Sequence, residues 1–206
     1  MQVKKKLQRV TSPLGVAVYP KLVKPDTKFD ANGVYSVDLD LDPNDKEVKA
    51  FVASIKKAAD TAYAEACEAK GGKKLKRADL SIKETEDGML RFKFKLKAKG
   101  GTEDKSWDQK PMLFDAKGNP IANPPSIGSG SKIRVAFELV PYFTAMVGAG
   151  VTFRMRAVQI CELREYTPDG GFDAFGFKAT DGYSAGSDAP ATTQDDATEE
   201  SDGVDF

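Results

Sequence analysis

The clearest strand pattern in the chain is Leu90-Arg-Phe-Lys-Phe-Lys-Leu-Lys-Ala-Lys99. Successive side chains of a strand point to opposite faces of a sheet, so this stretch predicts one buried apolar face and one basic face. The preceding Asp87-Gly88 is a typical hairpin turn, which predicts that residues 80–84 pair with this strand. The basic face, here called the basic row, is formed by Arg91, Lys93, Lys95, Lys97 and Lys99.

Further strand patterns flank this hairpin. Residues 15–23 form an expected strand in which Pro20 indicates an edge or a bulge, and residues 34–41 alternate strictly between apolar and polar. Beyond the hairpin we expect a polar loop containing Trp107. The remaining predicted strands are 112–114, 132–140 and 151–163, the last two joined by residues 141–150.

One long helix is predicted after residue 41. Asp42 is a good N-cap, Pro43 is tolerated at the first helical position, and Gly71-Gly72 is suited to the C-terminal end. The expected apolar stripe is Val48, Phe51, Val52, Ile55, Ala59, Ala62 and Ala66. Short strands with one inserted helix predict a mainly β fold, specifically a partly open, five-stranded Greek-key barrel of the oligonucleotide-binding (OB) type.

Charge is distributed unevenly along the chain. The 31 basic and 31 acidic residues cancel, but residues 181–206 hold eight of the acids and no Lys or Arg, which leaves residues 1–180 with a net charge of +8. Such asymmetry indicates a nucleic-acid partner. We expect a basic arm at 1–12, a folded domain at 13–180 and a disordered acidic tail at 181–206. Asp202, Asp205 and Phe206 form the expected protein-docking tip of the tail.

The residue types that are missing exclude several function classes. The chain has no histidine, so no Ser-His-Asp or Cys-His arrangement and no His-ligated zinc site can exist. Cys67 and Cys161 are too few for a cysteine-only metal site and are expected to be small core residues. We therefore expect no enzyme, no metal and no cofactor. An absence of long apolar runs predicts no membrane segment, no signal peptide and a cytosolic location.

The basic row is the strongest candidate binding surface. Five positive charges on one face repel each other unless an anion lies along them, and a phosphate backbone has a compatible charge spacing. The alternative is a solvated outer face whose lysines discourage edge aggregation.

A second basic stretch ends in aromatic residues. Lys132 and Arg134 lie on the polar face of a strand that leads into Tyr142 and Phe143, and aromatic rings beside basic residues suit base stacking. Because adjacent strand residues point opposite ways, we expect Tyr142 outside. Trp107 is a further stacking candidate. Lys4, Lys5, Lys6 and Arg9 predict a mobile basic arm.

Several motifs occur together in an informative order. They are Gly33-Val-Tyr-Ser-Val-Asp-Leu39, Phe92-Lys-Phe-Lys95, Ile127-Gly-Ser-Gly-Ser-Lys-Ile-Arg-Val135, Leu139-Val-Pro-Tyr142 and Val147-Gly-Ala-Gly-Val151. With an acidic tail ending in Asp-Phe, the chain resembles the single-stranded DNA-binding proteins of short-tailed, coliphage-like bacteriophages.

The resemblance implies an OB-fold protein, usually a homodimer, that coats single-stranded DNA during phage replication and recombination in the host cytoplasm. It also implies a tail that competes with DNA for the groove and docks on the phage DNA polymerase and helicase-primase. The groove residues that it implies are Lys4, Lys93, Lys95, Lys132 and Tyr142, with Phe206 as the docking tip.

Other functions fit parts of the pattern. A strand-annealing or recombination protein would use the same surface, and a scaffolding protein with an acidic tail would explain the charge split alone. A metal-dependent nuclease could use Asp38, Asp40 and Asp42, although their alternation with core residues is more simply the polar face of a strand.

Overall fold

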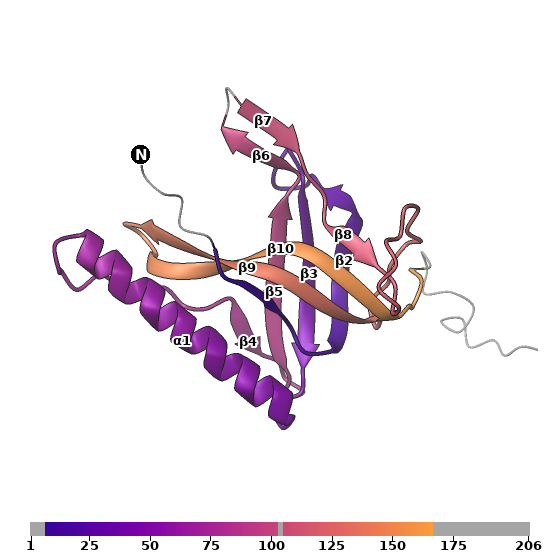
Figure 1. The fold of residues 1–206 in the computed structure, drawn as a ribbon, viewed down its shortest axis with the longest axis horizontal. Helices are drawn as coiled ribbons and strands as arrows, with labels where there is room; N and C mark the ends of the chain where they lie inside the picture. The colour runs from indigo at the N-terminus through magenta and orange to yellow at the C-terminus, as the bar shows by residue number, and fades with distance from the viewer. Residues whose placement is uncertain (1–6, 103–104, 167–206) are drawn as a thin grey trace, which may run out of the picture. The chain divides into compact units, whose positions relative to one another are not determined.

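The computed structural model describes residues 7–102 and 105–166, so the predictions for Lys4, Lys5, Lys6, the tail at 181–206 and its tip at Asp202, Asp205 and Phe206 lie outside the described residues. The elements follow one another along the chain in Figure 1. They are β1 (Arg9–Thr11), β2 (Gly15–Asp26), β3 (Val34–Leu41), α1 (Lys46–Ala69), β4 (Ile82–Glu84), β5 (Leu90–Lys97), β6 (Lys99–Thr102), β7 (Lys105–Asp108), β8 (Met112–Phe114), β9 (Lys132–Thr144) and β10 (Gly148–Glu162).

Five strands close into a barrel. The hydrogen-bonded order is β2-β3-β5-β10-β9, and β9 returns to pair with β2. Most neighbours are antiparallel, but β5 and β10 run parallel and are in register at one pair only, Lys95 with Arg154. The predicted mainly β fold, a partly open five-stranded barrel with one inserted helix, is confirmed. Because β5 and β10 pair at this one position only, the barrel is open on either side of it, and a hollow forms there.

The barrel core follows the predicted alternation. On β5, Phe92, Phe94 and Leu96 are buried, and on β3 every second residue from Tyr35 to Leu41 is buried. Phe51 brings α1 onto this core, with ring centroids 5.3 Å from Phe92. Burial of large aromatic side chains is the main stabilising contribution here, at about 25 cal/mol for each Å² of apolar surface removed from water. One face of each strand is thereby committed to the core.

The helix begins three residues later than predicted. Asp45, not Asp42, is the N-cap, and its carboxylate accepts a hydrogen bond from the amide of Glu47 at 2.7 Å. Asp42 instead accepts from the amide of Asn44 at 2.8 Å, which forms a local turn at Pro43. The predicted glycine end is confirmed, because Gly71 and Gly72 follow α1 with φ values of 76° and 75°.

Four other predictions need correction. Trp107 lies in β7, which pairs with β6, and not in a loop. The last two strands continue toward each other as a tight hairpin, with Pro141 paired to Val151 inside the ladder. Arg9 belongs to β1, which pairs with β9, so this part of the basic arm is a strand. Cys67 and Cys161 are only half-buried.

Candidate nucleic-acid interface

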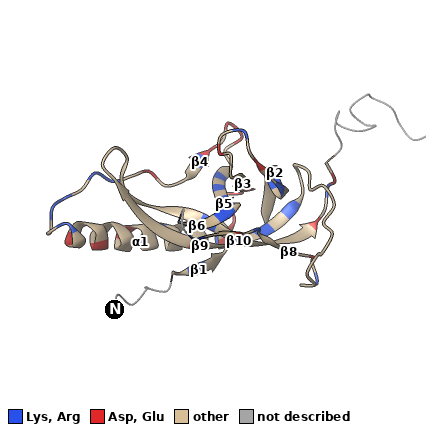
Figure 2. Ribbon diagram, turned by 90° about the horizontal axis from the view of Figure 1, so that it is seen from above, with Lys and Arg blue, Asp and Glu red and all other residues tan. Residues whose placement is uncertain are grey.

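Four members of the basic row, Arg91, Lys93, Lys95 and Lys97, lie on the outer face of β5, as the alternation predicts, whereas Lys99 belongs to β6. Lys93, Lys95 and Lys97 are exposed, and Figure 2 shows basic residues recurring along this strand. Part of the anion that the repelling row was expected to need comes from the neighbouring strand, at two of the row's members. Antiparallel pairing places Asp38 opposite Lys93 and Asp40 opposite Arg91, whereas Ser36 lies opposite Lys95.

Arg91 is held in a tight ion pair. Its guanidinium donates two hydrogen bonds of 2.7 Å to the carboxylate of Asp40, whose side chain is only 15% exposed. The hydrogen bond to Asp40, together with that carboxylate's charge, raises the pKa of Arg91 above its usual value. The ammonium of Lys93 lies 4.0 Å from Asp38. Within the described residues, no carboxylate forms an ion pair with Lys95 or Lys97.

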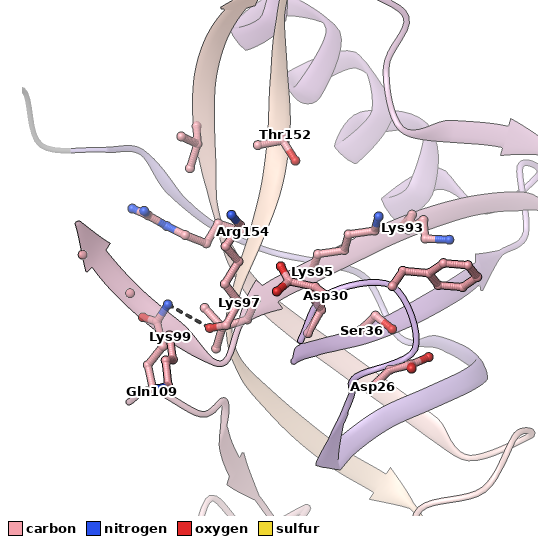
Figure 3. Close-up of a pocket in the computed structure, with 16 residues that line it drawn as sticks. Asp26, Asp30, Ser36, Lys93, Lys95, Lys97, Lys99, Gln109, Thr152 and Arg154 are labelled. Carbon is pink, nitrogen blue, oxygen red and sulfur yellow. Dashed lines mark hydrogen bonds between the residues drawn. The ribbon is translucent and has the colours of Figure 1, made fainter. Parts of the chain in front are cut away.

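A hollow opens where β5 and β10 diverge. Its volume is about 750 Å³, and it is lined by Lys93, Lys95 and Lys97 from β5 and by Arg154 from β10 (Figure 3). The loop between β2 and β3 forms the opposite wall. The lining residues are Asp26, Phe29, Asp30, Val34, Ser36, Lys93, Lys95, Leu96, Lys97, Lys99, Gly100, Gly101, Gln109, Val140, Thr152 and Arg154. We call this the β5–β10 hollow.

Three arginines converge beside this hollow on one carboxylate. Arg154 donates to Glu138 at 2.8 Å, and Arg9 and Arg156 approach the same carboxylate at 3.5 and 3.7 Å. Burial alone would raise the pKa of Glu138, but the hydrogen bond from Arg154 and the charges of Arg156 and Arg154 lower it overall. Three positive charges around one negative charge leave an excess of +2, so the cluster attracts anions.

An adjoining hollow contains Trp107. It shares Leu96, Gly100, Gly101, Gln109 and Arg154 with the first one. Arg9, Arg156 and Trp107 line it as well, and its volume is about 620 Å³. The Trp107 side chain is 58% exposed and lies directly over Gly100, where an added Cβ would meet the ring at 2.8 Å. The indole therefore sits at the end of the basic surface, available for stacking.

Tyr142 continues the same face beyond the first hollow. On the β9–β10 ladder Val140 pairs with Thr152, both lining the hollow, and the next outward pair is Tyr142 with Gly150. The missing side chain at Gly150 lets the Tyr142 ring approach, since a Cβ there would lie 3.3 Å from it. The expectation that Tyr142 is the outward ring is therefore wrong in part, because Tyr142 is half-buried on this face and Phe143 on the other face is the exposed ring, at 42%.

Lys132 and Arg134 lie apart from both hollows. Lys132 forms an ion pair of 2.9 Å with Glu162, and Arg134 forms one of 3.3 Å with Glu47 at the start of α1. Neither lines the hollows of the basic row or of Trp107. The structure thus brings Lys93, Lys95, Lys97 and Trp107 together and leaves Lys132 and Arg134 elsewhere.

The carboxylates considered for metal catalysis have other partners. Asp38 and Asp40 face the basic row, and Asp42 accepts a backbone hydrogen bond in the turn before α1. Within the described residues, no group of three or more acidic or cysteine side chains could hold a metal ion. No helix in that part of the chain combines the length and the apolarity that a membrane crossing needs.

The sequence matches a known family over most of its length. The family described as "Single-stranded DNA-binding protein, Bacteriophage T7" matches residues 15–163. The chain belongs to this family. Its relatives include the single-stranded DNA-binding protein of Escherichia phage T7, 33% identical over 88% of this chain and 87% of the relative. The corresponding protein of Enterobacteria phage T3 is 34% identical over 84% of this chain and 83% of the relative.

Solved structures agree with the fold of this family. The crystal structure of gp2.5, a single-stranded DNA-binding protein encoded by bacteriophage T7, has a TM-score of 0.71 and 32% identity, covering 88% of this chain and 100% of that chain. The single-stranded DNA-binding protein of bacteriophage Enc34, solved in complex with single-stranded DNA, has a TM-score of 0.56 at 15% identity over 76% of this chain and 88% of that chain, a likeness of fold alone.

For this family member, reasoning from sequence missed three residues at the hollows. Arg154 and Arg156 alternate with the buried Phe153 and Met155, so the period of two could have placed them on the outer face. Nothing local indicates that this face adjoins Lys95, since the contact depends on the parallel pairing of β5 with β10. Phe29 lies in a stretch that reads as turn chemistry, which concealed an exposed aromatic ring.

Proposed function

We propose that this chain binds single-stranded DNA without sequence preference, as a protein of phage DNA replication and recombination in the host cytoplasm. Family membership supports the ligand class. The observation that carries the proposal is the β5–β10 hollow, which combines the four lysines of the basic row with Arg154 and in which Lys95 and Lys97 form no ion pair with a described residue. An open cationic hollow of this kind suits a polyanion.

In this proposal the phosphates follow the cations of β5 and β10. Lys95 and Lys97 bind phosphates most strongly, because neither has to leave an ion partner among the described residues. The bases stack on Trp107 and Tyr142, which lie beyond the two ends of this cationic stretch. Aromatic rings stack with any base, so the affinity is nearly independent of sequence. The function requires binding alone, without catalysis.

Lys4 and Lys5 extend the basic surface in this proposal, while Lys132 and Arg134 contribute mainly long-range attraction. Residues 181–206, with eight acids and no base, act as a tethered polyanion that occupies the cationic hollow when DNA is absent. DNA displaces this tail and frees Asp202, Asp205 and Phe206 to dock on the phage DNA polymerase and helicase-primase. The protein acts as a homodimer.

A titration tests the ligand class. Labelled oligo-dT and a duplex of equal length are titrated at two salt concentrations. We expect strong preference for the single strand and a log affinity that falls by about 0.7 per neutralised phosphate for each decade of salt. Equal binding of both forms would contradict the proposal, and magnesium-dependent shortening of the oligonucleotide would indicate a nuclease.

Two variants test the tail. Truncation after Ala179 is expected to raise affinity for oligo-dT, because the competing anion is removed; unchanged or weaker binding contradicts self-competition. Phe206→Ala is expected to leave oligo-dT binding intact and to weaken polymerase capture. Simultaneous loss of both activities would show that the tail supports the fold instead.

A further inference from the structure

Phe29 is an unusual residue at the edge of the β5–β10 hollow. Its side chain is 90% exposed, more than any other large apolar side chain in the described residues, yet it lines the same hollow as Lys93, Lys95 and Lys97. Exposed single apolar residues are common on protein surfaces. The location of this ring, opposite a row of cations, is what calls for an explanation.

The loop that carries Phe29 is braced on both sides. The carboxylate of Asp26 accepts from the amide of Lys28 at 2.8 Å, and that of Asp30 accepts from the amide of Asn32 at 3.0 Å. Gly33, at a φ of 81°, closes the turn by donating to the Asp30 carbonyl at 2.8 Å. Its own carbonyl accepts from Ala98 at 2.8 Å, just after β5. The loop is therefore fixed relative to the basic row.

Charges of opposite sign line the two walls of the hollow, although the β2–β3 loop also carries Lys28, which lies over the Phe29 ring and does not line the hollow. β5 and β10 contribute the lysines and Arg154, whereas the β2–β3 loop contributes Asp26 and Asp30 (Figure 3). A phosphate is attracted to the first wall and repelled by the second. The lining charges therefore favour a nucleic acid strand whose backbone lies toward β5 and β10 and whose bases lie toward the β2–β3 loop.

We propose that phosphates bind along the basic wall of the hollow and that the Phe29 ring, on the opposite wall, is a stacking platform for a base. This inference rests on the proposed function. The Lys28 ammonium lies 5.5 Å from the ring centroid and covers one face. The other face stays accessible and receives the base. Stacking on an aromatic ring stabilises a bound base by about 1–3 kcal/mol without discriminating its identity.

The test compares oligonucleotides with and without bases. Wild type, Phe29→Ala, Phe29→Trp and Met146→Ala are titrated with oligo-dT and with an abasic oligonucleotide of the same length. Met146 is a matched control, since it is 85% exposed and lines neither hollow. Thermal unfolding of each variant verifies that the fold is retained.

We expect Phe29→Ala to bind oligo-dT about 5- to 150-fold more weakly than wild type, while its affinity for the abasic strand stays within about twofold. The salt dependence should not change, because no phosphate contact is removed. Phe29→Trp and Met146→Ala should resemble wild type on both ligands.

Two results would overturn the inference while leaving the proposed function intact. One is wild-type affinity of Phe29→Ala for oligo-dT. The other is an equal loss on both ligands, which would mean that the ring supports the loop or the phosphate contacts. Failure of the wild type itself to bind oligo-dT would instead overturn the proposed function, and this inference with it.

Discussion

Replacing Lys95 and replacing Arg91 should have opposite consequences, although both are basic residues of one strand face. Lys95 lies opposite Ser36 and forms no ion pair with a described residue, whereas Arg91 donates two hydrogen bonds of 2.7 Å to Asp40. We expect Lys95→Ala to weaken DNA binding and spare stability. Arg91→Ala should lower stability and largely spare DNA binding.

The magnitudes follow from these contacts. Loss of one phosphate contact by Lys95→Ala reduces the salt slope of log affinity by about 0.7, equivalent to about fivefold in affinity at 0.1 M salt. Arg91→Ala removes two charge-assisted hydrogen bonds and leaves Asp40, 15% exposed, without its partner, so the free energy of unfolding should fall by about 1–3 kcal/mol.

Anisotropy titrations with labelled oligo-dT between about 0.05 and 0.2 M salt measure the slope. Urea unfolding of the same samples measures stability. The reasoning is refuted if Arg91→Ala lowers the slope as much as Lys95→Ala does while the stabilities of the two variants are equal. That outcome would mean that the Asp40 ion pair opens to bind phosphate.

Further outcomes are expected at the neighbouring residues. Trp107, the single tryptophan of the chain, should lose fluorescence on oligo-dT binding, and Trp107→Ala should weaken binding by about 1–3 kcal/mol; unchanged emission at saturation would remove it from the interface. Tyr142→Ala should weaken oligo-dT binding by a similar amount, whereas Phe143→Ala, on the other face of β9, should not, and equal effects in anisotropy titrations would contradict the assignment of faces. Glu138 has a pKa below its usual 4.5, so its ionised form stabilises the fold at neutral pH and this contribution is lost as the pH falls below that value. Urea unfolding of Glu138→Gln should therefore show a weaker decline in stability with acidification than wild type, and parallel pH profiles would argue against the arginine cluster.

Strand patterns with a period of two were predictable because one face of each strand is committed to the core. Residues 34–41 illustrate this, since they alternate strictly and form a strand with those bounds. The strand predicted at 90–99 begins at Leu90 as expected but ends at Lys97, and Lys99 begins β6. The first residue of the helix was harder to predict, because Asp42 and Asp45 both have the side chain that an N-cap needs. Which one caps the helix depends on the turn that Asp42 forms with Asn44.

The candidate site was only partly predictable for a different reason. Lys95 and Lys97 could be placed on an outer face from their own strand. The pairing of Arg91 with Asp40, and the approach of Arg154 to Lys95, depend on the register between strands far apart in sequence. The register between these strands is set by the closed barrel as a whole, so it cannot be predicted from the sequence of one strand.

Protection of lysines from amine-reactive labelling is the most direct test of where DNA binds. The wild-type protein is labelled with and without saturating oligo-dT, and peptide mass spectrometry then compares the extent of labelling at every lysine. We predict strong protection of Lys93, Lys95 and Lys97 and unchanged labelling of the exposed Lys49 and Lys56 on α1. Unprotected β5 lysines in a saturated complex would contradict the account.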